Sequence, residues 1–226
     1  THPVLCIPEL MRILMDEYAF EWDDAWNIVS HTMAYTNHTV MAEALEKWPC
    51  HYVQQLLPRL YMIIEEINRR FMIELNKLGV DEGKKNAMAI IKDGQVHMTN
   101  LAIHAGYSVN GVAKLHTDIL KKMTFKEFYE LYPEKFNNKT NGITFRRWLL
   151  HCNPLLTNLI KSLIGDEFKQ DATKLEDLIK YIDDEKILKE ILDIKYNNKV
   201  ELKKYLKKAQ DIEINEHPFV LEAQIY

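Results

Sequence analysis

Residues 98–120 read MTNLAIHAGYSVNGVAKLHTDIL, and this stretch decides between a purely helical fold and a mixed one. Its first part, Met98–Ala105, is short and apolar and is followed by Gly106. This pattern is typical of a buried strand in an α/β sheet. A helix is expected to open at Asn110–Gly111, because apolar residues then recur at helical spacing up to Leu120. The stretch therefore predicts one short strand leading into a helix.

The sequence before this stretch is helical in pattern. From Tyr52 to Leu78, apolar residues recur at three- and four-residue steps, and Pro58 is expected in the first turns or at a kink. Gly79 should end this helix, because glycine adopts a positive φ at little cost. A loop is expected over Val80 to Ala87.

The sequence after it is also helical but more highly charged. Asn153 and Pro154 read as the cap and first residue of a helix that ends at Gly165. Helical spacing then returns over residues 183–208, and residues 219–226 revert to an apolar pattern compatible with an extended segment. The fold class expected is mainly α with a short β element.

Composition excludes several classes of protein. The chain has 226 residues, a formal net charge of -4 and no basic stripe, so we expect no nucleic-acid partner. No apolar run is long enough for a membrane helix, and no signal peptide is visible. Three widely spaced cysteines indicate reduced thiols and a cytoplasmic location. The missing initiator Met predicts a piece of a longer chain.

Three polar segments are candidates for a binding site. Residues 34–40 place amide, hydroxyl and imidazole groups together, with Trp48 nearby, which suits a sugar; a loop that bonds its own backbone explains them as well. Residues 109–113 form a Gly turn before a helix, which suits an anion or simply close packing. Arg146 and Arg147 either hold a phosphate or are solvated at a helix start.

Sequence motifs for other chemistries are missing. The nine histidines show no metal-ligand spacing, so we expect no metal. Neither a GxSxG nucleophile nor a pair of catalytic carboxylates is visible. Residue chemistry alone therefore indicates a helical domain with polar loops.

Longer strings make a more specific comparison possible. THPVLCIPELMRILMD, WDDAWNIVSHTMAYTNHTVMAEALEKWP, SVNGVAKLHTDILK, FNNKTNGIT, RRWLLHCNP and the terminal AQI occur in this order. In this the chain resembles the glycogen and maltodextrin (α-1,4-glucan) phosphorylase family, clearly to about Gly165 and weakly beyond. The resemblance implies an internal fragment of a two-lobed α/β glycosyltransferase of the GT-B type.

The resemblance also implies a domain division and an activity. Residues 1–144 would be the C-terminal part of the N-terminal lobe, and residues 145–226 a helical connection to a missing C-terminal lobe. The parent would be a glycosyltransferase that phosphorolyses terminal α-1,4-glucosyl bonds with inorganic phosphate, releasing glucose 1-phosphate. Its glucan would be glycogen, starch or maltodextrin, its cofactor pyridoxal phosphate, and we expect a homo-oligomer.

Individual site residues follow from the same resemblance. His38 matches the histidine whose carbonyl and ring face the sugar, and Asn141 the asparagine that binds its 6-hydroxyl. His2 and Val112 match residues beside the glucosyl pocket, and Trp148 matches a tryptophan near the cofactor. Arg146 and Arg147 match family residues and are given a structural role.

No catalytic set is complete in this segment. In the family, the Gly-rich loop near the cofactor phosphate would lie before Thr1, and the Schiff-base lysine after Tyr226. The isolated piece is therefore predicted to be inactive. The alternatives are a non-catalytic glucan-binding or regulatory module and a purely structural helical protein.

Overall fold

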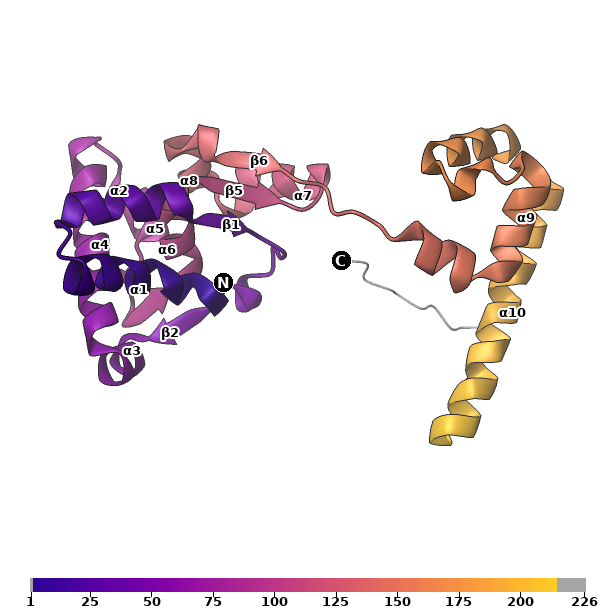
Figure 1. Ribbon diagram of the computed structural model, residues 1–226, viewed down its shortest axis with the longest axis horizontal. Helices are drawn as coiled ribbons and strands as arrows, with labels where there is room; N and C mark the ends of the chain where they lie inside the picture. The colour runs from indigo at the N-terminus through magenta and orange to yellow at the C-terminus, as the bar shows by residue number, and fades with distance from the viewer. Residues whose placement is uncertain (1, 215–226) are drawn as a thin grey trace. The chain divides into compact units, whose positions relative to one another are not determined.

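The computed structural model describes residues 2–214, apart from the side chain of His2. The chain divides into two compact units, Thr1–Asn141 and Gly142–Tyr226, and each is described by itself (Figure 1). The apolar segment expected over residues 219–226 lies outside the described residues.

The first unit is mainly helical, as expected. Its helices are α1 (Cys6–Arg12), α2 (Trp22–Thr32), α3 (Cys50–Leu56), α4 (Pro58–Lys77), α5 (Glu82–Met88), α6 (Met98–Ala105), α7 (Lys114–Ile119) and α8 (Lys126–Leu131). Single π-helical turns follow α1 and α7, at Ile13–Glu17 and Leu120–Thr124. Short 3-10 turns occupy His2–Leu5, Ala42–Ala44 and Pro133–Lys135.

The β structure is richer than the single strand expected. The described strands of the first unit are β1 (Ala34–Thr36), β2 (Lys47–Pro49), β3 (Ile91–Lys92), β4 (Gln95–His97), β5 (Ser108–Gly111) and β6 (Phe136–Asn138). They form two sheets, and Figure 1 shows β1, β5 and β6 side by side in one of them.

The sheet of β1, β5 and β6 is parallel. Its order is β1-β5-β6, with Tyr35 opposite Val109 and Val109 opposite Phe136. Parallel neighbours need a long crossover, and α7 and α8 supply it between β5 and β6. Both Val109 and Phe136 are buried, so the middle of this sheet belongs to the core.

The second sheet is antiparallel, with the order β2-β4-β3. Asp93 and Gly94 connect β3 to β4 with φ values of 50° and 70°. Two successive positive φ angles make the tight hairpin turn that Asp-Gly favours. The Asp-Gly pair is a hairpin signal in the sequence, and the prediction of a single strand missed it.

The expected strand at Met98–Ala105 is wrong, because these residues form helix α6. Every residue of α6 is buried, so the helix shows no polar face in its sequence and reads like a buried strand. Its polar side chains find partners inside the core; Asn100 Nδ2, for example, donates to the carbonyls of Ala87 (3.1 Å) and Ala89 (2.8 Å). The strand lies after Gly106 instead, at β5.

Three neighbouring expectations also need correction. The helix expected from Asn110–Gly111 begins at Lys114, because β5 continues to Gly111. The loop expected over residues 80–87 contains α5, whose cap is Asp81 accepting from the Lys84 backbone N–H. The two polar loops at residues 34–40 and 136–144 each begin with a strand, β1 and β6.

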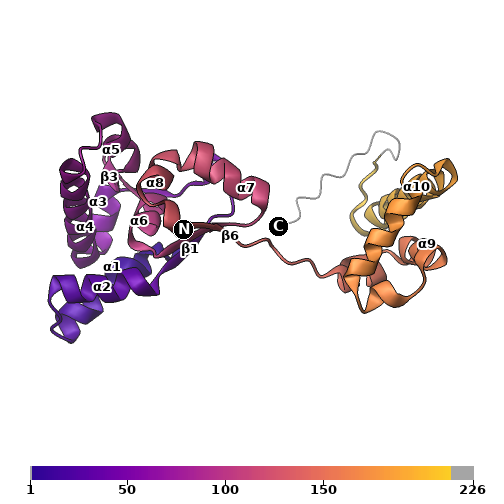
Figure 2. The ribbon, with the colours of Figure 1, turned by 90° about the horizontal axis from the view of Figure 1, so that it is seen from above.

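The long helix expected over residues 52–78 is confirmed in two pieces. Leu57 breaks it, and Pro58 then starts α4 at a position where the missing N–H costs nothing. Gly79 follows with a φ of 69°, as expected. The buried face of α4 includes Ile64 and Phe71, which lie in the main core. In Figure 2, α3 and α4 lie together, as do α1 and α2.

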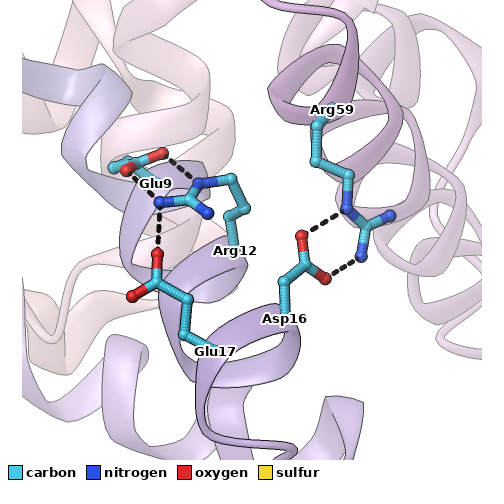
Figure 3. Close-up of polar contacts among 5 residues, drawn as sticks. All are labelled: Glu9, Arg12, Asp16, Glu17 and Arg59. Atoms are coloured by element: carbon cyan, nitrogen blue, oxygen red, sulfur yellow. Dashed lines mark hydrogen bonds and ion pairs between the residues drawn. The ribbon is translucent and has the colours of Figure 1, made fainter.

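Ion pairs on the surface join the start of the chain to α4 (Figure 3). Arg12 donates from Nη2 to Glu9 Oε1 (2.8 Å) and to Glu17 Oε1 (2.9 Å), while Arg59 of α4 donates from Nη2 to Asp16 Oδ1 (2.6 Å). The Arg59 guanidinium lowers the pKa of Asp16. These pairs lie at the surface, exposed or half-buried, where ion pairs add little to the stability of a fold.

The second unit is helical through most of its described part, residues 142–214. It contains a π-helical stretch (Arg146–His151), α9 (Pro154–Ile164), 3-10 helices at Glu167–Lys169 and Ala172–Tyr181, and α10 (Glu185–Gln210). The expected cap is confirmed, because the Asn153 side chain accepts from the Leu156 N–H. Phe168 is fully buried here. Among the described residues, no helix is both long and apolar enough to cross a membrane.

Candidate functional site

The parallel sheet brings three of the predicted site residues to one edge. His38 follows the end of β1, Val112 follows β5, and Asn141 follows β6. Carboxyl ends of parallel strands meet at the same edge of a sheet, where α/β proteins bind their ligands. The three residues, scattered over 104 positions of sequence, therefore lie at one edge of the sheet.

Asn37, which is only 1% exposed, anchors the loop after β1 by hydrogen bonds. Its backbone N–H donates to the Asn110 carbonyl (2.9 Å), which extends the pairing with β5 by one bond. Its side-chain oxygen accepts from the Thr39 N–H (3.0 Å), and its Nδ2 donates to the Tyr35 hydroxyl (3.0 Å). His38 is left exposed between two fixed neighbours.

The loop after β5 depends on a close approach between backbone segments. A Cβ at Gly111 would lie 2.4 Å from Thr117 Oγ1 and 2.9 Å from Thr117 Cα. Tight packing of α7 on β5 thus accounts for this glycine, so no anion site is needed to explain it. Val112 is half-buried, and its N–H donates to His116 Nδ1 (3.0 Å).

The loop after β6 is bonded to the loop after β5. The Lys139 N–H donates to the Gly111 carbonyl (3.1 Å), and the Asn141 N–H donates to the Val112 carbonyl (2.9 Å). Thr117 Oγ1 also donates to Asn138 Oδ1 (3.0 Å). Asn141 itself is exposed at this edge of the sheet.

A pocket of about 290 Å³ lies beside β1. Its lining includes the apolar side chains of Val4 and Ile7, the ring of Tyr35, and His38. Its volume is close to the lower end for small-molecule pockets, about 300 Å³. An imidazole at the rim of an apolar cavity suits a ligand that has both hydroxyl groups and a hydrophobic face.

Two predicted site residues are not brought to this edge. His2 begins the 3-10 turn that lines the pocket through Pro3 and Val4, but its side chain lies outside the described residues. Trp148 belongs to the second unit, in the π-helical stretch, where it is 60% exposed. The place of Trp148 near the cofactor therefore stays a prediction.

Two residues that support the sheet-edge loops are not singled out by the sequence. Asn37 stands out there only as part of a polar loop, and His116 only as part of the string SVNGVAKLHTDILK. Burial, and secondarily His38, lowers the pKa of His116, so its ring is neutral. The sequence offers one signal for His116: it lies four residues after Val112, and side chains four residues apart on a helix are neighbours.

Lys135 is the residue to test as an anchor for an aldehyde cofactor. Burial lowers the pKa of Lys135 to about 8, a property shared with lysines that form imines. However, its Nζ donates to the carbonyls of His104 (2.8 Å) and Ile103 (3.3 Å), and it precedes β6, at the other edge of the sheet. Lys135 therefore does not fit the role. Among residues 2–214, no group of three acidic, His or Cys side chains suits a metal.

Comparison with known proteins decides the family. Residues 1–225 match the family model for carbohydrate phosphorylases. The chain belongs to the carbohydrate phosphorylase family. It is 47% identical over 222 residues to the muscle form of glycogen phosphorylase from Bos taurus, covering 95% of this chain and 26% of that protein. It is 50% identical over 217 residues to maltodextrin phosphorylase from Streptococcus pneumoniae, covering 95% of this chain and 28% of that protein.

The resemblance to this family is confirmed, and so is the expectation that the chain corresponds to only part of its relatives. The chain spans about a quarter of the length of the curated relatives that it matches. The residues at the sheet edge consequently belong to a segment of this family.

Proposed function

We propose that this chain is a segment of an α-1,4-glucan phosphorylase and forms one wall of its glucosyl site. The observation that carries the proposal is the convergence of His38, Val112 and Asn141 at the carboxyl edge of the parallel sheet. Imidazole, amide and backbone groups are the donors and acceptors that sugar hydroxyls require. The apolar pocket beside His38 offers a surface for the sugar ring.

The parent protein would release glucose 1-phosphate from glycogen, starch or maltodextrin and inorganic phosphate. Its fold would be the two-lobed GT-B type, with residues 1–144 in the N-terminal lobe and residues 145–226 leading to the second lobe. Its pyridoxal phosphate would be held by residues outside this chain, except for Trp148, which we place near the cofactor. The bound cofactor would supply a phosphate group for proton exchange with the substrate phosphate.

The isolated chain is proposed to be inactive. In its described part it offers positioning groups for a sugar but no phosphate clamp and no fitting cofactor lysine. Groups of those kinds contribute many powers of ten to an enzymatic rate. We also propose that the parent is cytoplasmic, because its cysteines are expected to be reduced thiols. The exposed apolar side chains support a homo-oligomer.

The test compares the full-length parent with the 226-residue chain. Glucose 1-phosphate release from maltoheptaose and phosphate is measured for both, with and without added pyridoxal phosphate. An active parent beside a silent fragment supports the proposal. A parent that is silent on maltoheptaose, glycogen and starch overturns it, and binding of maltoheptaose without turnover then favours the glucan-binding module.

A further inference from the structure

The β1–β5 pairing ends just before the loops that carry His38 and Val112. Its last paired residues are Thr36 and Asn110, and one more backbone bond joins Asn37 to Asn110. Beyond that point, within the part of the chain that the structure describes, no further ladder bond joins the His38 loop to the Val112 loop. Beyond that point, the contact between the two loops is made by side chains.

His116 of α7 makes that connection with both ring nitrogens. Nδ1 accepts the Val112 backbone N–H at 3.0 Å, and Nε2 lies 3.1 Å from Asn37 Oδ1. A backbone N–H can only donate, so Nδ1 carries no proton and Nε2 carries it. The ring therefore donates to Asn37 while it accepts from Val112.

The orientation of the Asn37 amide agrees with this assignment. Its Oδ1 also accepts the Thr39 N–H at 3.0 Å, so this atom is the oxygen rather than the nitrogen. Its Nδ2 donates to the Tyr35 hydroxyl at 3.0 Å. All of the partners are consistent with one neutral form of His116, and burial lowers the pKa of that ring.

The connection extends to the third loop through Val112. The Val112 N–H is bonded to His116, while the Val112 carbonyl accepts the Asn141 N–H at 2.9 Å. Movement of Val112 would thus displace Asn141 as well. The imidazole thus bridges the loops after β1 and β5, and the Val112–Asn141 bond extends that connection to the loop after β6.

We infer that His116 is a positioning residue that sets the geometry of His38 and Asn141 around the 6-hydroxyl of the glucosyl unit. The inference rests on the proposed function, and it deepens it by adding a residue that does not itself face the sugar. Displacing a positioned group by about 1 Å can cost a factor of about 100 in rate. The loss should fall on the interactions with that hydroxyl.

The test uses the full-length enzyme in the direction of glucan synthesis, with two donors. Glucose 1-phosphate has the 6-hydroxyl, and 6-deoxyglucose 1-phosphate lacks it. For His116→Ala we expect kcat/KM to fall about 100-fold with glucose 1-phosphate and within about threefold with the 6-deoxy donor. A loss of stability alone would reduce both donors alike.

Three further variants sharpen the experiment. His116→Gln keeps an amide that can still reach one of the two partners, so it should recover part of the activity. Asn37→Ala removes the same hydrogen bond from the other side. In the double variant with His116→Ala, the loss of activity should therefore be smaller than the two single losses combined. His31→Ala is the control, because His31 is exposed and its ring bonds a backbone carbonyl within its own helix, α2 (2.7 Å to Asn27).

The outcomes separate this inference from the proposed function. A wild-type enzyme without activity overturns the proposed function. An active wild type with an unchanged His116→Ala variant, or with equal losses for both donors, overturns the positioning role alone. A selective loss with glucose 1-phosphate, together with a normal His31→Ala variant, supports it.

Discussion

Gly111 shows how a single missing side chain permits α7 to pack closely on β5. The approach of Thr117 to this position leaves no room for a Cβ, and one of the two close atoms is backbone, which cannot rotate away. A larger residue would push α7 off β5, and His116 would move with α7. Packing and site geometry are therefore coupled at one glycine.

Gly111→Ala should lower the free energy of unfolding by about 1–3 kcal/mol, because the added methyl overpacks a closed site. Gly142→Ala is the control, since nothing lies within 4 Å of its added Cβ and its φ is ordinary. Urea denaturation of both variants measures the difference. Equal stabilities would show that α7 can shift without cost.

His104 makes a second residue-scale prediction. Its ring stacks between Phe71 (4.0 Å) and Trp26 (5.5 Å), and burial, with a smaller effect of Lys135, lowers its pKa to about 3. An unfolded histidine has a pKa of about 6.5, so the unfolded chain takes up the proton first as the pH falls. Stability is therefore complete above about pH 6.5 and is lost as the pH falls toward 3.

Between pH 7 and pH 5 the unfolding free energy should drop by about 2 kcal/mol through His104. Burial lowers the pKa of His97 to about 4, so His97 adds a drop in the same direction. His104→Phe keeps an aromatic ring in the stack but cannot titrate, so its drop should be smaller by the His104 share. Urea titrations at both pH values decide the matter, and an unchanged drop would contradict the assignment.

At the scale of elements, α6 shows why pattern reading fails inside a core. Its eight residues carry no helical periodicity, because neighbours cover it on every side. Periodic signals survive where one face meets solvent, and α4 and α10 are predictable for that reason. The short strands escape prediction because three residues carry too little pattern to stand out from a loop.

The start of α10 offers a test of a local signal. The Asp184 side chain accepts from the backbone N–H groups of Lys186 and Ile187, at 3.0 and 3.1 Å. Asp184→Ala should cost the helix about 1 kcal/mol, a usual loss for an N-cap. Hydrogen exchange in the first turn of α10 measures it. Asp183→Ala is the control, and equal protection in both variants would refute the capping role.

For the whole molecule, the second unit leaves apolar side chains uncovered. Leu188 and Leu192 lie one turn apart on α10 and are both exposed, as are Ile179 and Ile182. Exposed apolar side chains favour association when they lie close together, as Leu188 and Leu192 do on one helix. We expect the isolated chain to self-associate as its concentration rises.

Replacing Leu188 and Leu192 by lysine should reduce that association, because a charged surface replaces an apolar one. Sedimentation velocity over a concentration series gives the measurement. Replacing Lys189 and Lys195, also on α10, by glutamine is a control that leaves the leucines in place. Association unaffected by the leucine changes would place the contact elsewhere.

The amino-acid sequence by itself determined the family and the helical class, and it singled out three residues that the structure then places at one edge of the sheet. Long colinear strings, caps such as Asn153 and stops such as Gly79 are local, so they can be read without coordinates. Only the tertiary structure decided that α6 is a helix, that three short strands run parallel, and that His116 joins their loops. Those facts depend on contacts between residues as far apart as Asn37 and His116, 79 positions in sequence. Hydrogen bonds across such separations leave no spacing pattern in a single chain.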